Sequence, residues 1–173
     1  MTGTNSDTAR MLRVDQAGEY GATRIYAGQL AVMGTRAPRA AEIAAMAAQE
    51  AAHRERFDAL LAARGVRPTV LQPLWSIAGF ALGAATALAG PETAMACTAA
   101  IEEEIDRHYT RQLEALGEAD AELSGLIEDS RADERAHRQV ALEAGAEKAP
   151  AYPLVAAAIR LGCRIAIGLS ERI

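Results

Sequence analysis

The feature that most constrains this chain is a pattern of acidic residues and histidine that occurs twice. In each copy a glutamate precedes a Glu-x-x-His motif, by 31 residues in the first copy and by 32 in the second. The two copies are Glu19, Glu50 and His53, then Glu102, Glu134 and His137. A single Glu-x-x-His motif is weak because chance produces it often, but this repeat contains two of the three histidines of the chain. The repeat predicts one site to which both halves of the chain contribute.

The composition favours helices over strands. Half of the residues are apolar, but only 4% are aromatic. Most of the apolar residues are Ala and Leu, which favour helix together with Glu and Arg, whereas strands are enriched in β-branched and aromatic residues. A chain of 173 residues is long enough for one domain with its own core. We expect a single all-α domain over residues 1–173.

Turn-forming residues divide the chain into two helical hairpins. Gly34 to Pro38 separates the helices of the first hairpin, and Gly117 to Asp120 separates those of the second. Gly65 is placed to end the second helix, and Pro91 suits the first position of the third. The four predicted helices are Thr8 to Met33, Arg39 to Arg64, Pro91 to Leu116, and Ala121 to about Ala144.

Two further segments are unusually apolar. The 24 residues from Pro68 to Pro91, between the hairpins, contain no charged side chain. After a break from Ala149 to Pro153, the segment from Leu154 to Ile173 reads as a last helix that is apolar over most of its circumference. We expect a four-helix bundle with a long apolar crossover segment and an additional C-terminal helix.

The repeated glutamates and histidines lie on the same helical stripes as the predicted core residues. Residues three, four and seven apart share one face of a helix, so all six side chains are expected to point inward. The stripes are Glu19, Ala22, Tyr26, Leu30 and Met33; Ile43, Met46, Glu50, His53, Phe57, Leu60 and Leu61; Met95, Thr98, Glu102, Ile105, Tyr109, Leu113 and Leu116; and Leu123, Ile127, Ser130, Glu134, His137 and Ala141.

Four carboxylates that face one another in a core need positive charge beside them. Without it they repel and take up protons, and an unpaired buried charge costs several kcal/mol. Two divalent ions balance four carboxylates, and two neutral imidazoles complete the ligand set. Carboxylate and imidazole ligands suit iron or manganese. One Glu from each of two helices plus Glu-x-x-His from each of the other two is the pattern of ferritin-like di-iron proteins.

Two tyrosines, one histidine and two glutamates lie close to the predicted ligands on the first and third helices. Tyr26 and Tyr109 face inward, where each phenol either hydrogen-bonds a ligand, lines a substrate pocket or simply packs in the core. His108 is about 120° from the ligand face, so it is a poor ligand and serves either as a hydrogen-bond partner of the site or as an ordinary flanking histidine. Glu103 and Glu104 turn away from the stripe and are expected to be solvated.

Charge and cysteine usage exclude several classes of function. A net charge of -5 with no basic stripe argues against a nucleic-acid partner. Cys97 and Cys163 are far apart in the sequence and form no Cys-x-x-Cys pair, which fits a reducing compartment. The polar segment from Met1 to Arg10 resembles neither a secretory signal nor a transit peptide, so we expect a cytoplasmic protein.

Beyond the repeat, the chain resembles the demethoxyubiquinone hydroxylases of ubiquinone biosynthesis over nearly its whole length. The resemblance lies in sequence blocks that generic ferritins lack. These blocks are Arg13 to Ala22, Arg24 to Gly28, Gln49 to His53, Ala96 to Glu103, His108-Tyr109, Asp133 to His137, Ala149 to Tyr152, Gly162 to Ile167, and Ser170 to Arg172. The six iron ligands of that family correspond to the six repeated residues found above, with no departure from the pattern.

The resemblance implies a monooxygenase that hydroxylates the benzoquinone ring of a polyprenylated methoxyquinol. It also implies two iron ions and an external reductant, for which NADH is the candidate. The chain itself contains no dinucleotide-binding fingerprint, so the electrons must come from outside. A homo-oligomer and a lipid-carrier partner are left open.

The uncharged crossover segment fits a substrate with a long apolar tail. The 17 residues between Pro73 and Pro91 would span about 25 Å as a helix, against a membrane hydrocarbon core of about 30 Å. We therefore expect this segment to lie in the membrane surface, with burial inside the protein as the alternative. In the C-terminal helix, Arg160 and Arg164 are expected to meet anionic headgroups. Peripheral attachment to the cytoplasmic face of the bacterial inner membrane follows.

Two other functions remain as alternatives. The first is another ferritin-like di-iron function, such as iron storage or peroxide reduction, against which the uncharged crossover argues. The second is a non-enzymatic membrane-associated helical module in which the Glu-His pairs are structural. The metal content of the purified protein separates this second alternative from the enzymes.

Overall fold

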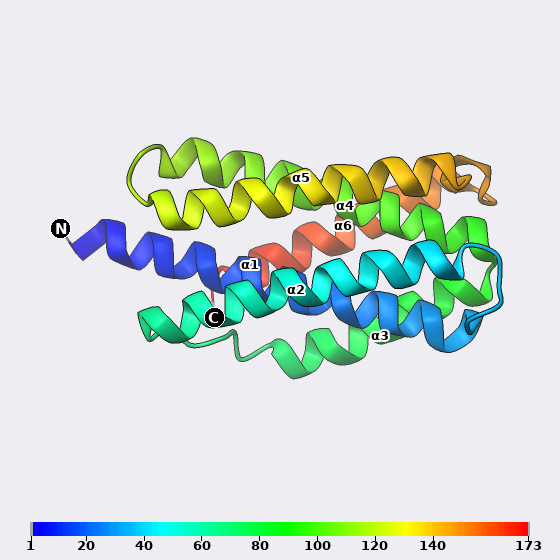
Figure 1. The fold of residues 1–173 in the computed structure, drawn as a ribbon, viewed down its shortest axis with the longest axis horizontal. Coiled ribbons are helices and arrows are strands. Elements are labelled where there is room, and N and C mark those ends of the chain that lie inside the picture. The colour runs from blue at the N-terminus through cyan, green and yellow to red at the C-terminus, as the bar shows by residue number, and fades with distance from the viewer. Residues whose placement is uncertain (1, 173) are drawn as a thin grey trace.

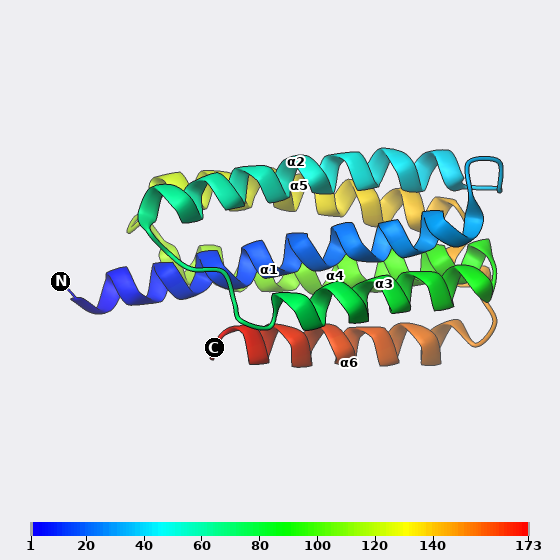
Figure 2. The same ribbon diagram turned by 90° about the horizontal axis from the view of Figure 1, so that it is seen from below.

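The computed structural model describes residues 2–172 and contains six α-helices and one short 3-10 helix, with no strand in that range. The helices pack in three layers of two, with α2 and α5 in one outer layer, α1 and α4 in the middle, and α3 and α6 in the other outer layer (Figures 1 and 2). Their bounds are α1 Thr2–Met33, α2 Ala40–Arg64, α3 Gln72–Leu88, α4 Pro91–Leu116, α5 Ala121–Glu143, η1 Ala146–Lys148 and α6 Tyr152–Ser170. The predicted all-α bundle, its crossover helix and its C-terminal helix are confirmed.

The helix ends follow the sequence signals closely. Gly65 ends α2 in the left-handed conformation at φ 63°, which glycine adopts without strain. Pro91 begins α4, where its missing N–H group is not needed. The Asp120 side chain accepts a hydrogen bond of 3.0 Å from the Leu123 backbone N–H at the start of α5. The first helix begins at Thr2, earlier than the predicted Thr8.

The crossover helix α3 lies along α1 and is held there by very close backbone contact. A Cβ atom added at Gly83 would lie 1.9 Å from the backbone oxygen of Ile25, and one added at Gly28 would lie 2.1 Å from the backbone oxygen of Phe80. Only glycine permits this approach. The opposite face of α3 exposes large apolar side chains, so this helix is buried on one side and open on the other. The exposed residues are Leu74, Ile77 and Leu88.

The C-terminal helix α6 packs against α4, and this contact corrects two predictions. Glu104 is buried, contrary to the predicted solvation, because α6 covers a second face of α4. Its carboxylate lies 2.9 Å from Arg107 Nη1 and 3.6 Å from Arg164 Nη1. Arg160 pairs at 3.1 Å with Glu103, whose side chain is only 19% exposed. Both arginines that were expected to meet lipid headgroups thus form ion pairs within the protein.

Candidate metal centre

The four bundle helices α1, α2, α4 and α5 bring the six repeated residues together at the centre of the fold. All six residues are at most 3% exposed, as their helical stripes predicted. They form two overlapping groups, in each of which one ligand atom per residue lies within 4.8 Å of the others. The groups are Glu19, Glu50, His53 and Glu134, and then Glu50, Glu102, Glu134 and His137.

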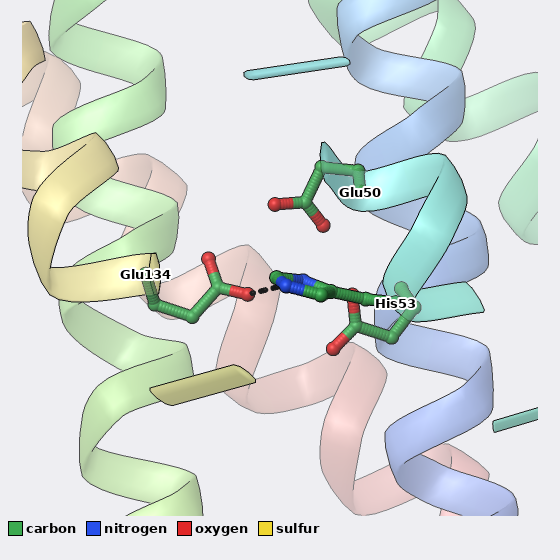
Figure 3. Close-up of side chains that lie close together, drawn as sticks. Glu50, His53 and Glu134 are labelled. Carbon is green, nitrogen blue, oxygen red and sulfur yellow. Dashed lines mark ion pairs between the residues drawn. The ribbon is translucent and has the colours of Figure 1, made fainter. Parts of the chain in front are cut away.

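Two glutamates belong to both groups and therefore lie between them. Glu134 Oε1 is 3.6 Å from His53 Nδ1, and Glu134 Oε2 is 3.6 Å from His137 Nδ1. Glu50 Oε1 is 3.1 Å from His137 Nδ1. Figure 3 shows Glu50 and His53, both from α2, facing Glu134 across the bundle from α5. This arrangement suits two cations, one in each group, that share the carboxylates of Glu50 and Glu134.

Hydrogen bonds hold the outer atoms of the cluster. Tyr26 donates to Glu102 Oε1 at 2.6 Å, and Tyr109 donates to Glu19 Oε1. His53 Nε2 lies 2.9 Å from Asp133 Oδ2, and His137 Nε2 lies 2.9 Å from Gln49 Oε1. Because both partners are acceptors, each Nε2 carries a hydrogen and each Nδ1 is left to face the cluster. The two tyrosines thus bond the cluster, one of the roles predicted for them, while the sequence did not reveal Gln49 and Asp133.

The inner atoms of the cluster have no hydrogen-bond partner among the described residues. A buried polar atom without a partner costs free energy, so such atoms are rare unless an ion or water satisfies them. Of the 17 such atoms among the described residues, eight belong to this one cluster, and each of its six residues contributes at least one. The eight atoms are Glu19 Oε2, both Glu50 oxygens, His53 Nδ1, Glu102 Oε2, both Glu134 oxygens and His137 Nδ1. This donor set fits a pair of divalent cations.

The protonation of the metal-free cluster reflects the same crowding of charge. Burial and the neighbouring carboxylates raise the pKa of Glu50 and of Glu102 well above the usual 4.5. Burial lowers the pKa of His53, but the carboxylates of Glu134 and Glu19 outweigh it and raise this pKa to about 11. Burial lowers the pKa of His137. Without cations, the site therefore holds protons in their place.

His108 lies apart from the cluster and pairs with a residue that sequence reasoning missed. Its Nε2 atom is 3.3 Å from Asp15 Oδ1, and both side chains are buried. Burial raises the pKa of Asp15, although His108 opposes the shift. Asp15 is one helical turn before Glu19, so its spacing from the repeat was the signal that could have found it.

An apolar cavity of about 390 Å³ lies on the side of the bundle that faces α3 and α6. Its walls come from α1, α3, α4 and α6, and they include Gly18 and Ile101, the chain neighbours of Glu19 and Glu102. Ala78 of α3 and Gly162 of α6 line the cavity and are exposed, so it reaches the surface between these helices. Near one end, Trp75 Nε1 donates a 3.0 Å hydrogen bond to Ser170 Oγ, which joins α3 to α6.

The fold and the site together define a class. A helical bundle with one crossover, whose core gathers four glutamates and two histidines from two Glu-x-x-His motifs, is a ferritin-like carboxylate protein. Within that class, the chain belongs to the family of the ubiquinone biosynthesis protein COQ7, whose family model matches residues 6–170.

Relatives with curated names cover most of this chain. A 3-demethoxyubiquinol 3-hydroxylase of Rhodospirillum rubrum is 52% identical over 164 residues, which are 95% of this chain and 77% of the relative. The human mitochondrial NADPH-dependent 3-demethoxyubiquinone 3-hydroxylase is 51% identical with the same coverage of both chains. The mitochondrial 5-demethoxyubiquinone hydroxylase of Saccharomyces cerevisiae is 39% identical over 180 residues, again covering 95% of this chain and 77% of the relative. The family resemblance seen in the sequence is confirmed.

Proposed function

We propose that this protein is a di-iron monooxygenase that hydroxylates the benzoquinone ring of a polyprenylated demethoxyubiquinol in ubiquinone biosynthesis. The observation that carries the proposal is the buried cluster of six residues whose unpartnered atoms face one another. The relatives named as demethoxyubiquinone or demethoxyubiquinol hydroxylases supply the substrate class.

In this proposal each half of the repeat contributes to two iron positions. Glu19 and His53 would hold one ion, Glu102 and His137 would hold the other, and Glu50 and Glu134, which belong to both groups, would contribute to both positions. When bound, the two ferrous ions supply the electrons that activate dioxygen. The chain buries this chemistry completely, and Tyr26 and Tyr109 fix the orientation of the terminal carboxylates through their hydrogen bonds.

The apolar cavity between α3 and α6 is the proposed binding site for the quinone. Its walls are almost wholly apolar, which suits a ring with a polyprenyl tail and excludes water from the reacting carbon. Gly18 and Ile101 place its inner wall beside Glu19 and Glu102. Iron and peroxide are small and polar and do not need an apolar cavity, so the cavity favours the hydroxylase over iron storage and peroxide reduction.

The electrons come from outside the chain, which lacks a G-x-G-x-x-G fingerprint. We propose a reduced nicotinamide nucleotide as the source. The name of the human relative specifies NADPH, whereas the sequence reading favoured NADH. Comparing the two nucleotides in one assay decides between them.

We place the protein on the cytoplasmic face of the bacterial inner membrane, with α3 and α6 against the lipid. Both helices flank the cavity and expose large apolar side chains, which on α6 include Leu154, Leu161 and Ile165. Among the described helices, α6 alone is long and apolar enough to cross a membrane. Its ion pairs with α4 favour a position along the surface, since a spanning helix would have to break them.

The reaction is tested with demethoxyubiquinol, a reduced nicotinamide nucleotide and isotope-labelled dioxygen. The new hydroxyl oxygen should come from the gas, and the iron-loaded protein should carry close to two irons per chain. Glu50→Ala and Glu134→Ala should lose iron and turnover while keeping their helix content. A product oxygen that comes from water, or full turnover in Glu102→Ala, would contradict the proposal.

Membrane attachment is tested by flotation with anionic liposomes. Ile77→Asp combined with Leu161→Asp places a charge on the exposed face of each outer helix and should release the protein into the soluble fraction. Val140→Asp is the matched control, because Val140 is also an exposed apolar residue but lies on α5 in the opposite layer. Unchanged flotation of the double variant would show that this face does not contact lipid.

A further inference from the structure

The internal repeat extends beyond the six cluster residues to the groups that surround them. Tyr26 is seven residues after Glu19 and donates to Glu102, while Tyr109 is seven residues after Glu102 and donates to Glu19. The two halves of the bundle thus exchange equivalent hydrogen bonds. In these two hydrogen bonds the proposed iron positions match.

The equivalence is broken at the residue immediately before each Glu-x-x-His motif. His53 Nε2 faces the carboxylate of Asp133, and His137 Nε2 faces the amide oxygen of Gln49, both at 2.9 Å. Position 133 precedes Glu134 just as position 49 precedes Glu50, so the two acceptors occupy corresponding places in the repeat. One acceptor is charged and the other is neutral.

This difference acts on the histidines through their N–H groups. A carboxylate acceptor draws the Nε2 hydrogen more strongly than an amide does and leaves more electron density on Nδ1, the atom that faces the cluster. Asp133 is 43% exposed, so it stays in contact with water, and solvent screens part of its charge. The hydrogen bond to His53 is nevertheless direct.

We infer that Asp133 and Gln49 are positioning residues that make the two iron positions unequal. The position beside His53 binds a divalent cation more tightly and favours its oxidised state more than the position beside His137. This inference rests on the proposed di-iron function and attributes a difference between the two positions to one pair of residues outside the cluster.

The test is a calorimetric titration of the metal-free protein with ferrous ion under anaerobic conditions. The wild type should bind in two steps whose affinities differ beyond the statistical ratio for two equal sites. Asp133→Asn keeps an oxygen acceptor for His53 but removes the charge, and it should weaken the tighter step by about tenfold or more. Gln49→Glu adds the charge on the other side and should strengthen the weaker step, which brings the two steps together.

Single-position variants assign the steps. His137→Ala should leave the tighter step, which Asp133→Asn then weakens, and His53→Ala should leave the weaker one. Asp129→Asn, one turn before Asp133 on the same helix and paired with Arg56 away from the cluster, is the matched control and should change neither step. The iron reduction potential should rise in Asp133→Asn, a shift that a purely structural role would not produce.

The outcomes separate this inference from the proposed function. Two equal steps in the wild type, or equal effects of Asp133→Asn on both steps, would overturn the inference while leaving the hydroxylase intact. If the wild type bound no ferrous ion, that result would contradict the proposed di-iron function itself. Helix content and melting temperature of each metal-free variant show that the protein has folded.

Discussion

At the scale of single residues, the cluster is a balance between burial and charge. Tyrosine hydroxyls hold the outer oxygens of Glu19 and Glu102, and all four carboxylates face one another on the inner side. In the absence of cations the same residues must keep protons in order to stay buried. The stability of the metal-free protein is therefore linked to pH through these groups.

We predict that the metal-free protein loses stability as pH rises from about 5 to about 9. The pKa values of Glu50 and Glu102 are raised by burial from 4.5, and that of His53 is raised from 6.5 to about 11 by Glu134 and Glu19 against the effect of burial. A group whose pKa is raised on folding stabilises the folded state fully below its unfolded pKa and loses that contribution as pH rises. Burial also raises the pKa of Glu134. His137, whose pKa is lowered by burial, opposes the trend but is one group of the cluster against four.

Melting temperatures with and without chelator measure this dependence. Iron should weaken or reverse the trend, because cation binding needs deprotonated ligands. At acid pH a different group acts. Arg64 lowers the pKa of Asp120, so the stability that Asp120 contributes to the folded state is lost as pH falls through that pKa. A metal-free melting temperature that rises steadily between pH values of about 5 and 9 would contradict the protonated cluster.

Single residues also show where sequence reasoning succeeded and where it failed. The six cluster residues were predicted because spacing along one helix reports which side chains share a face. Glu104 was wrongly predicted to be solvated because the same spacing does not reveal that α6 covers another face of α4. Gln49 and Asp133 were missed because each bonds a histidine on a different helix, and no pattern within one helix contains that contact.

At the scale of elements, α3 depends on backbone contact more than on side-chain interdigitation. We predict that Gly83→Ala and Gly28→Ala each destabilise the protein by about 3 kcal/mol, the upper range for overpacking, because the new Cβ would meet backbone oxygen. Gly125→Ala is the control, since it is exposed on α5 with open space at its Cβ and should stabilise the helix by about 0.5–1 kcal/mol. Urea unfolding measures both effects. Equal stability of all three variants would mean that α1 and α3 can separate without cost.

The ends of the elements were largely predictable, whereas their packing was not. Gly65, Pro91 and Asp120 mark helix boundaries through local backbone chemistry, which the sequence displays directly. The crossover was expected either in the membrane surface or inside the protein. Its glycine face lies on α1 and its apolar face is exposed, a division that depends on how closely two backbones approach.

At the scale of the whole molecule, the layers separate two environments. The polar cluster lies inside the four-helix bundle, and the apolar cavity lies between the bundle and the outer pair α3 and α6. Four helices that are far apart in the sequence form the walls of this cavity, so no local sequence pattern could predict it. In the proposed function, a tailed substrate binds in this cavity, next to helices α1 and α4, which carry Glu19 and Glu102.

We predict that filling this cavity blocks long-tailed substrates selectively. Gly162 lines the cavity and has open space at its Cβ, so Gly162→Trp introduces a large ring into the cavity without a clash in the core. The variant should keep its iron content and helix content but turn over a long-tailed demethoxyubiquinol at least tenfold more slowly, an effect of about 1.4 kcal/mol. A tail-free analogue, which occupies less of the cavity, should be affected less.

Gly168→Trp is the control, because Gly168 lies on the same helix with open space at its Cβ but does not line the cavity. Equal slowing of long-tailed and tail-free substrates in Gly162→Trp, or equal effects of the two tryptophan variants, would mean that the substrate reaches the iron by another path.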